Sequence, residues 1–332
     1  MNRPDLETLS AVSTLETPTV SVIVTMFNGV DVVCETLESV RNQTFQYFEV
    51  IIIDDGSTDN SAAIARRFCK TDLRFRLMTQ ANAGPAAALN ALILQARGEW
   101  IALLDQDDVW FPQKLERQME LSREDSRANF LFTNFHFWDG RRDSHVMYRD
   151  DEPLPEGDTI RQLITNYIYC LSTVMVRRQT LLDAGLFDTE LKKSYDWDMW
   201  LRIAEHGIWA RGIREPMARY RRWPGSVSIA NRLACDDDNA LAIKKRLHAT
   251  RHADLIPLYR HSLAMLQTYC EMARARSLVE SNPDAVPPFV WRSWCHDHRR
   301  MWLRWYFCLV WPKWLGGNAT RRYVHRKIIS RW

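Results

Sequence analysis

Features of secreted, disulfide-bonded and membrane-spanning proteins are missing from the sequence. Its seven cysteines are odd in number and scattered, with no C-x-x-C pair, so neither a disulfide framework nor a zinc site is indicated. No basic segment followed by an apolar run opens the chain, which argues against an ordinary secretory signal. The longest uncharged run, residues 77–96, contains asparagine, glycine and proline, unlike the stretch of about 20 apolar residues that spans a bilayer. We therefore expect a cytoplasmic protein whose membrane contacts, where they occur, are at the inner face of the plasma membrane.

Glycine-rich phosphate loops are also missing. A dinucleotide site would need G-x-G-x-x-G after the first strand, and Asn28-Gly29-Val30 does not supply it. A nucleotidyltransferase would open with a Gly-rich loop where Thr25-Met-Phe-Asn28 stands. A receiver domain would need a later strand that ends in a lone phospho-accepting aspartate with a downstream lysine, and we find none. The sequence argues against all three classes.

Acidic residues are few in the rear part of the chain. Residues 233–332 hold 17 Lys/Arg against 8 Asp/Glu, whereas residues 1–232 hold 27 against 33. We expect a flexible, polar leader over residues 1–17, a large domain over 18–232 and a basic, Trp-rich helical extension over 233–332. Nucleic acid is a poor partner, because phosphate contacts need basic residues and the front part is acidic.

Apolar runs typical of strands alternate with helical patterns along the front part. Strands are expected at 20–25, 49–54, 75–79, 100–104, 129–138 and 171–176. Helices are expected at 33–40, 86–96 and 196–206, and from about 240 onward. A further helix is expected to run to Cys69, with Ser57 or Thr58 as its N-terminal cap. This alternation predicts an α/β fold with a mainly parallel central sheet flanked by helices. Right-handed crossovers place the strand ends, and any ligand, at one edge of such a sheet.

An acidic D-x-D motif follows the fourth predicted strand. Asp105 and Asp107 are two residues apart, so their carboxylates should lie on the same side, next to Asp108. Three acids repel one another unless a cation lies among them, and Mg²⁺ is commonly held by one or two carboxylates plus substrate phosphates. The alternative is a solvated turn or helix cap.

A second acidic pair, Asp54-Asp55, follows the second predicted strand at the same edge. Carboxylates in this crevice can bind a base N–H or ribose hydroxyls. The alternative is a local role, in which Ser57, Thr58 and Asp59 cap the next helix. The two roles are compatible.

Taken together, segments within residues 19–228 resemble the catalytic domain of the family 2 glycosyltransferases, which have the GT-A fold. Each segment is weak by itself, but their joint order and spacing make the resemblance specific. They are Ser21 to Asn28, Glu35 to Val40 with Gln43-Thr44, Asp54 to Asp59, Asn82 to Asn90, Arg97 to Glu99, Asp105 to Asp108, Gly185 to Asp188, and Asp196 to Arg202.

The resemblance implies roles for the matching residues. Asp105 and Asp107 would hold a divalent cation, Mn²⁺ or Mg²⁺, that bridges the donor diphosphate, and Asp196 would be the general base. The implied donor-binding residues are Thr25, Phe27, Glu35, Asp54, Asp55, Asn90 and Asp105, and the implied acceptor-side residues are Gly185, Phe187, Asp188 and Trp197. Spacing alone does not choose between Asp196 and Asp198, since either carboxylate could cap the helix that begins there.

The sequence departs from the family pattern at two positions. Leu89 stands where the family often has arginine, and Trp223 stands where it often has a histidine that could be a metal ligand. Arg221 or Arg222 can neutralise the donor diphosphate instead, a task suited to a planar guanidinium. The alternative for these arginines is a solvated loop.

The last 42 residues combine aromatic and basic side chains. They hold seven tryptophans, from Trp291 to Trp332, and ten Lys/Arg beside a single acid, Asp297. This composition is typical of helices that lie in a membrane interface, which would suit a lipid-linked acceptor. The alternative is a helical cap packed on the catalytic domain.

The predicted function is that of an inverting, metal-dependent, hexosyltransferase-like enzyme. It would move a sugar from a nucleotide-sugar donor, with UDP as the expected nucleotide, to a saccharide or lipid-linked acceptor in cell-surface polysaccharide or glycoconjugate synthesis. Inversion is implied by the resemblance. The alternative is a GT-A-like module that has lost transfer and binds sugar nucleotides or a membrane surface, for which Leu89 and Trp223 are the support.

Overall fold

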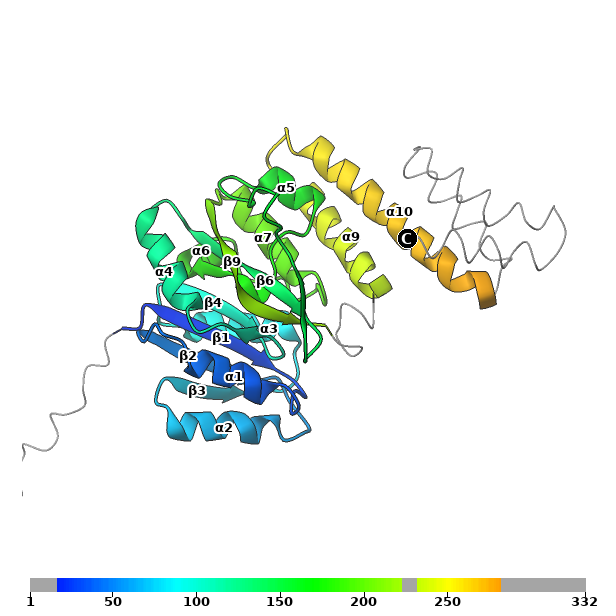
Figure 1. Cartoon of the computed structure of the whole chain (residues 1–332). Helices are drawn as coiled ribbons and strands as arrows, with labels where there is room; N and C mark the ends of the chain where they lie inside the picture. The colour runs from blue at the N-terminus through cyan, green and yellow to red at the C-terminus, as the bar shows by residue number, and fades with distance from the viewer. Residues whose placement is uncertain (1–16, 223–231, 282–332) are drawn as a thin grey trace, which may run out of the picture. The chain divides into compact units, whose positions relative to one another are not determined.

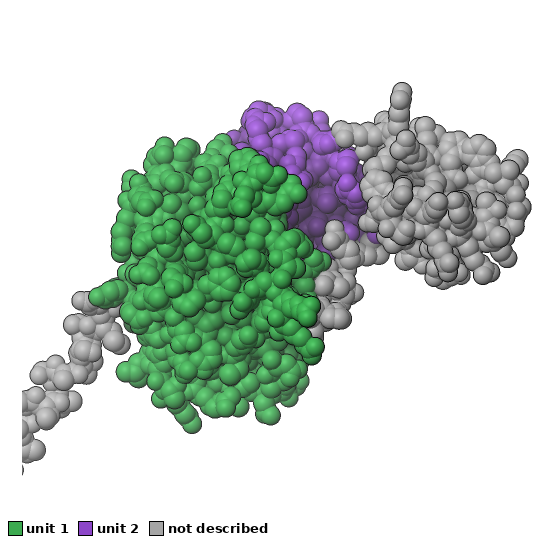
Figure 2. Space-filling view, in the orientation of Figure 1, with its two compact units in different colours: residues 1–159, 168–189, 206–223 green, residues 160–167, 190–205, 224–332 purple. Residues whose placement is uncertain are grey.

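The computed structural model describes residues 17–222 and 232–281. The predicted leader (apart from its last residue), the position of Trp223 and the aromatic and basic segment 291–332 lie outside the described residues. The chain forms two compact units that interleave along the sequence (Figure 2). Unit 1 comprises residues 1–159, 168–189 and 206–223, and unit 2 comprises 160–167, 190–205 and 224–332.

Unit 1 is built on one mixed sheet (Figure 1). Its strands are β1 (Val20–Met26), β2 (Phe48–Asp54), β3 (Phe75–Thr79), β4 (Trp100–Asp105), β5 (Val109–Trp110), β6 (Phe130–Trp138), β7 (Asp143–Val146), β8 (Met175–Arg177) and β9 (Ala210–Arg221). They follow the order β3-β2-β1-β4-β8-β6-β9-β5, with β7 paired to β6.

The parallel part of the sheet is the part that alternates with helices. β3, β2, β1 and β4 pair in parallel, because each connects to the next through a helical crossover. β1 and β2 are buried nearly throughout, as their continuous apolar runs predict. Beyond β4, only β6 and β9 pair in parallel among the described strands. The α/β prediction is confirmed, and the second half of the sheet adds the antiparallel pairings that make it mixed.

Helices cover both faces of this sheet. Those of unit 1 are α1 (Val33–Arg41), α2 (Ser61–Thr71), α3 (Pro85–Gln95), α4 (Lys114–Glu124) and α6 (Arg178–Asp183). The crossovers through α1 and α2 run in one direction along the sheet and the one through α3 returns, which places α3 on the opposite face (Figure 1).

Two local predictions were wrong. Residues 171–176 do not form one strand: Leu171–Thr173 is a 3₁₀ turn, η2, and only then does β8 begin. Neither Ser57 nor Thr58 caps α2, which begins at Ser61 after Asn60. The Ser57 hydroxyl instead accepts the Asn28 backbone N–H at 2.9 Å.

Glu49 is a buried carboxylate within β2, 3% exposed. One oxygen accepts the Ser21 hydroxyl at 2.7 Å and the Arg97 backbone N–H at 2.8 Å, and the other accepts the Arg76 and Arg97 guanidinium groups. Burial by itself raises the pKa of Glu49, but the hydrogen bonds from Arg97, Ser21 and Arg76 outweigh it, so the pKa is lowered.

Glu49→Gln is therefore expected to lower the free energy of unfolding by about 2 kcal/mol at neutral pH, because the charge-assisted bonds are lost. A lowered pKa in the folded state gives stability above the unfolded pKa that disappears as the pH falls through the folded pKa. In urea unfolding, the difference in the free energy of unfolding between Glu49→Gln and wild type should thus shrink below about pH 4. Glu38→Gln is the control, because Glu38 forms an exposed ion pair with Arg41. An unchanged difference at low pH would contradict the assignment.

Unit 2 is helical in its described residues. It contains α5 (Ile160–Thr165), α7 (Tyr195–Glu205), α9 (Arg232–Ala249) and α10 (Ile256–Ser281). Helices α9 and α10 run side by side (Figure 1). Among the described residues, no helix combines the length and the apolarity needed to cross a bilayer.

Candidate active site

The carboxyl ends of β1, β2 and β4 bring the predicted donor-binding residues to one edge of the sheet. Thr25 on β1 is in register with Asp105 on β4, and the next residue, Met26, is in register with Asp54 on β2. The two acidic motifs therefore lie on either side of the end of β1. This neighbourhood follows from parallel pairing, as the alternation predicted.

Gln106, between the two acids of the D-x-D motif, holds the loop after β1. Its side-chain amide accepts the Phe27 N–H at 2.9 Å and donates to the Phe27 carbonyl at 3.0 Å. Its own carbonyl accepts the Thr36 hydroxyl at 2.6 Å. A Cβ on Gly29 would lie 2.3 Å from the Gln106 side-chain oxygen, so a larger residue there would displace the Gln106 amide from the Phe27 backbone. The Phe27 ring is 44% exposed, which leaves it available to a ligand.

Asp108 is the most deeply buried acid of the motif, at 1% exposed. Its Oδ1 accepts the Arg221 backbone N–H at 2.8 Å, while Oδ2 has no hydrogen-bond partner among the described residues. Burial, followed by the negative charges of Asp107 and Asp105, raises the pKa of Asp108 well above its usual range. The three carboxylates thus repel one another, as the sequence suggested.

This arrangement fits a divalent cation held partly by the substrate. Within residues 17–222 and 232–281, no group of three His, Cys, Asp or Glu side chains forms a ready metal cage. Asp105 and Asp107 would supply one or two oxygen ligands, and phosphate oxygens and water would complete the shell, which is how proteins usually hold Mg²⁺. A cation there would relieve the repulsion that acts on Asp108.

Arg221 ties the end of β9 to the acidic motif. Its Nε donates to the Asp107 carbonyl at 2.7 Å, and its Nη2 pairs with the Glu35 carboxylate at 2.6 Å. The guanidinium also stacks over the Trp138 ring, 4.1 Å from its centroid. The structure therefore joins Glu35 and Arg221, both predicted to bind the donor, as an ion pair at the motif.

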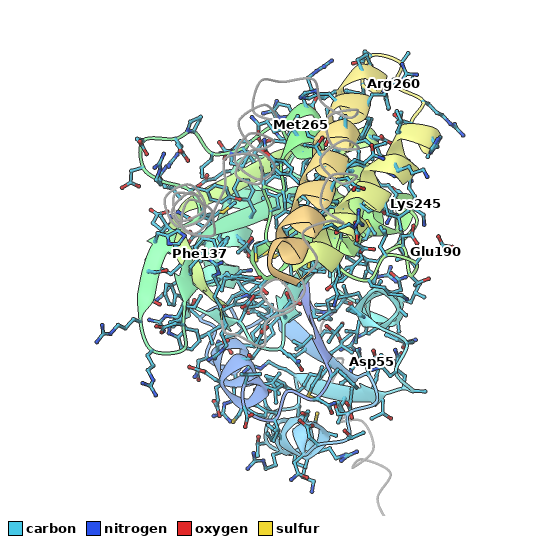
Figure 3. All side chains as sticks on the ribbon, turned by 90° about the vertical axis from the view of Figure 1, so that its right-hand side faces the viewer. Asp55, Phe137, Glu190, Lys245, Arg260 and Met265 are labelled. Carbon is cyan, nitrogen blue, oxygen red and sulfur yellow. The ribbon has the colours of Figure 1, made fainter. Side chains whose placement is uncertain are left out.

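Arg222 is placed differently. Its side chain is exposed and lies over the Phe137 ring, 5.3 Å from the centroid (Phe137 is labelled in Figure 3). Its backbone N–H donates to the Trp138 carbonyl at 2.7 Å, which fixes its position beside Arg221. The Arg222 guanidinium is therefore exposed over Phe137, whereas the Arg221 guanidinium contacts the acidic motif.

Asp54 and Asp55 both hold the loops around them. Asp54 accepts the Ser57 N–H at 3.0 Å. Asp55, labelled in Figure 3, accepts the Gln80 side-chain amide and the Ala83 N–H through Oδ1, and the Gly84 N–H through Oδ2. Both carboxylates therefore hold loop backbone, which differs from the helix cap that the sequence offered as the alternative, and Asp55 fixes the loop that leads into α3.

The Asn90 side chain forms hydrogen bonds with the segment around Phe187, which is predicted to lie beside the acceptor. Its side-chain oxygen accepts the Phe187 N–H at 2.8 Å, and its amide donates to the Phe187 carbonyl at 2.9 Å. The preceding residues, Gly185 and Leu186, have φ values of 84° and 63°, a left-handed backbone that is costly for leucine. The Asn90 amide thus holds this turn in place.

Asp196 lies in the first turn of α7 in unit 2, two residues before Asp198. Its Oδ2 accepts the Tyr167 hydroxyl at 2.6 Å, and its Oδ1 accepts the Trp197 N–H at 2.7 Å. Burial, offset in part by these bonds, raises the pKa of Asp196 to about 6. The carboxylate is therefore ionised near neutral pH yet basic enough to accept a proton.

Asp198 is in a different environment. It is 1% exposed and pairs with Arg202 at 2.8 Å and with Arg246 at 3.2 Å. A buried carboxylate between two guanidinium groups is structural, because removal of its charge takes a buried counter-charge away from both of them. The two acids that the sequence could not separate are thus distinguished by their partners.

Comparison with known proteins agrees with this geometry. The family described as Glycosyl transferase family 2 matches residues 21–185. The Bacillus subtilis (strain 168) protein TuaG, a glycosyltransferase named for teichuronic acid biosynthesis, is 33% identical over 218 residues, which cover 64% of this chain and 82% of that protein. The chain belongs to glycosyl transferase family 2. The predicted family is thereby confirmed.

Solved structures show the fold of this family 2 glycosyltransferase. S. aureus TarS 1–349 in complex with UDP-GlcNAc has a TM-score of 0.61 at 21% identity, over 82% of this chain and 80% of that chain. The Pyrobaculum calidifontis mannosyltransferase PcManGT in complex with GDP-Man and Mn²⁺ has a TM-score of 0.58 at 18% identity, over 95% and 88%. The predicted GT-A fold is confirmed.

Three residues of the glycosyltransferase were missed from the sequence. Gln106 carried a signal, since it lies within the D-x-D motif. Ser172, whose hydroxyl accepts the Asp105 N–H at 3.0 Å, was hidden in a segment predicted to be a strand. Tyr167 carried no signal, because its contact with Asp196 joins residues distant in sequence.

Proposed function

We propose that this glycosyltransferase moves a sugar from a UDP-sugar to a saccharide or lipid-linked acceptor, with inversion, in cell-surface polysaccharide or glycoconjugate synthesis. The observation that carries the proposal is the acidic motif at the end of the parallel strand β4, beside Thr25 and Asp54. The name of TuaG supports a role in a cell-surface polysaccharide, and the TarS complex with UDP-GlcNAc supports a UDP-linked donor.

The donor diphosphate would be held at the acidic motif. Asp105 and Asp107 would bind Mn²⁺ or Mg²⁺, which neutralises the charge of the leaving diphosphate. The PcManGT complex with Mn²⁺ supports this choice of cation. Arg222 adds an exposed positive charge, and Arg221, held by Glu35, fixes the Asp107 backbone. The exposed Phe27 ring offers a surface on which the nucleoside base can stack.

Asp196 would act as the general base. As the acceptor oxygen forms a bond to the anomeric carbon, the bond from that carbon to the diphosphate breaks. The electron pair of the broken bond leaves with the nucleoside diphosphate, and the hydroxyl proton passes to the Asp196 carboxylate. A single displacement of this kind inverts the anomeric configuration. The support is the match to the family pattern together with the hydrogen-bonded, weakly acidic carboxylate.

A panel of UDP- and GDP-sugars tests the proposal. We expect hydrolysis or transfer from at least one UDP-sugar in Mn²⁺ or Mg²⁺, and none in EDTA, measured as release of the nucleoside diphosphate. Binding of a sugar nucleotide without turnover on any acceptor would instead support a binding module that has lost transfer. Metal-independent turnover would contradict the cation assignment.

A further inference from the structure

The hydroxyl of Tyr167 is fixed on the carboxylate of Asp196. Tyr167 follows α5, and its hydroxyl donates to Asp196 Oδ2 at 2.6 Å. The other carboxylate oxygen accepts the Trp197 backbone N–H at 2.7 Å. The Trp197 indole in turn donates to the Leu163 carbonyl on α5 at 2.8 Å, so α5 and the start of α7 are joined directly. The carboxylate is therefore held at both oxygens.

Stability alone does not account for this bond. The Tyr167 side chain is 42% exposed, so it adds little to the core of unit 2. A hydrogen bond from a partly exposed phenol adds little to the stability of the fold, so its main effect is expected on the orientation and charge of the Asp196 carboxylate. The remaining lone pairs of Oδ1 and Oδ2 are left for another proton donor.

The charged groups of the surrounding helices are directed elsewhere. On α9, Asp238 accepts the backbone N–H groups of Lys193 and Ser194, and Arg246 pairs with Asp198. Lys245, also on α9, pairs with Glu190, and Figure 3 labels these two residues. From α10, Tyr259 donates to Glu205. Within the described residues, Tyr167 is the side chain that donates to Asp196.

We propose that Tyr167 is a positioning residue for the general base: its hydroxyl orients the Asp196 carboxylate and stabilises its ionised form. The proposal rests on the role of Asp196 in the proposed function. Burial raises the pKa of Asp196, and the bond from Tyr167 opposes that rise. Loss of the hydroxyl should therefore raise the pKa further and move the loss of activity on acidification to higher pH.

The test is the pH profile of kcat at saturating donor for the wild-type protein and for Tyr167→Phe, from about pH 5 to about pH 9. The wild type should lose activity below about pH 6. Tyr167→Phe should lose activity at a pH about one unit higher, because loss of a hydrogen bond to a charged carboxylate raises its pKa by about one unit. Its rate should be roughly tenfold lower than wild type on the acid limb and nearly equal near pH 9, with an unchanged KM for the donor.

Two further variants separate the outcomes. Tyr269→Phe is the matched control, because Tyr269 is an exposed tyrosine on α10, and its profile should equal that of wild type. If Asp196→Asn is inactive but Tyr167→Phe has the wild-type profile, the positioning role is wrong and the base assignment stands. If Asp196→Asn is active, the base assignment of Asp196 and the positioning role of Tyr167 are both wrong. A uniform loss at every pH with early melting would make Tyr167 structural and overturn the proposal.

Discussion

Asp107→Ala is expected to lower kcat by a factor of roughly 10³ or more, because a metal contributes several kcal/mol to stabilising charge on a phosphoryl oxygen. The affinity for UDP should fall as well, and only in the presence of Mn²⁺ or Mg²⁺. Calorimetry with UDP, with and without EDTA, measures the second effect, and release of the nucleoside diphosphate measures the first.

The matched control is Asp183→Ala. Asp183 is an exposed acid in α6 that accepts only the Gln179 side chain among the described contacts. Asp183→Ala should leave kcat and the affinity for UDP unchanged. Full activity of Asp107→Ala, or equal UDP affinity with and without EDTA, would remove the metal assignment while leaving the family intact.

Asp196→Asn is expected to lower kcat by roughly 10²- to 10⁴-fold, the usual effect of a general base. The amide has the same shape as the carboxylate but cannot accept a proton from the acceptor hydroxyl. Donor affinity and the melting temperature should stay near the wild-type values. Glu190→Gln serves as the control, because Glu190 is an exposed acid of the same unit that pairs with Lys245.

Asp198→Asn sharpens this test. It should lower the free energy of unfolding by about 3–5 kcal/mol, because Arg202 and Arg246 lose a buried counter-charge. Its activity, measured well below its melting temperature, should exceed that of Asp196→Asn. If both variants melt early and lose activity equally, the pair is structural and the base lies elsewhere.

The parallel half of the sheet could be predicted because its signals are local. Continuous apolar runs such as Val50 to Ile53 are buried on both faces, and the alternation with helices fixes their parallel pairing. The common edge of Asp54 and Asp105 then follows from topology without knowledge of any contact. These residues could be assigned to one site from their positions alone.

The individual roles of site residues were harder to predict, because they depend on contacts between distant segments. Asn90 meets Phe187, and Tyr167 meets Asp196, through folding that no local pattern encodes. The apolar composition of 171–176 suits a strand, yet a 3₁₀ turn is needed to present Ser172 to Asp105. A carboxylate such as Asp55 can cap a loop or bind a ligand with the same atoms, so composition could not decide.

The contact between Gln106 and the loop at Gly29 has a consequence for how related sequences can vary. The side-chain amide of Gln106 occupies the space that a Cβ at position 29 would need. It also makes two hydrogen bonds with the Phe27 backbone, which a shorter side chain would leave to water. The middle residue of an acidic motif and a glycine in a remote loop should therefore be inherited as a pair. A lineage that places a larger residue at 29 must move or shorten the side chain at 106, and the Phe27 backbone then loses the hydrogen bonds of that amide.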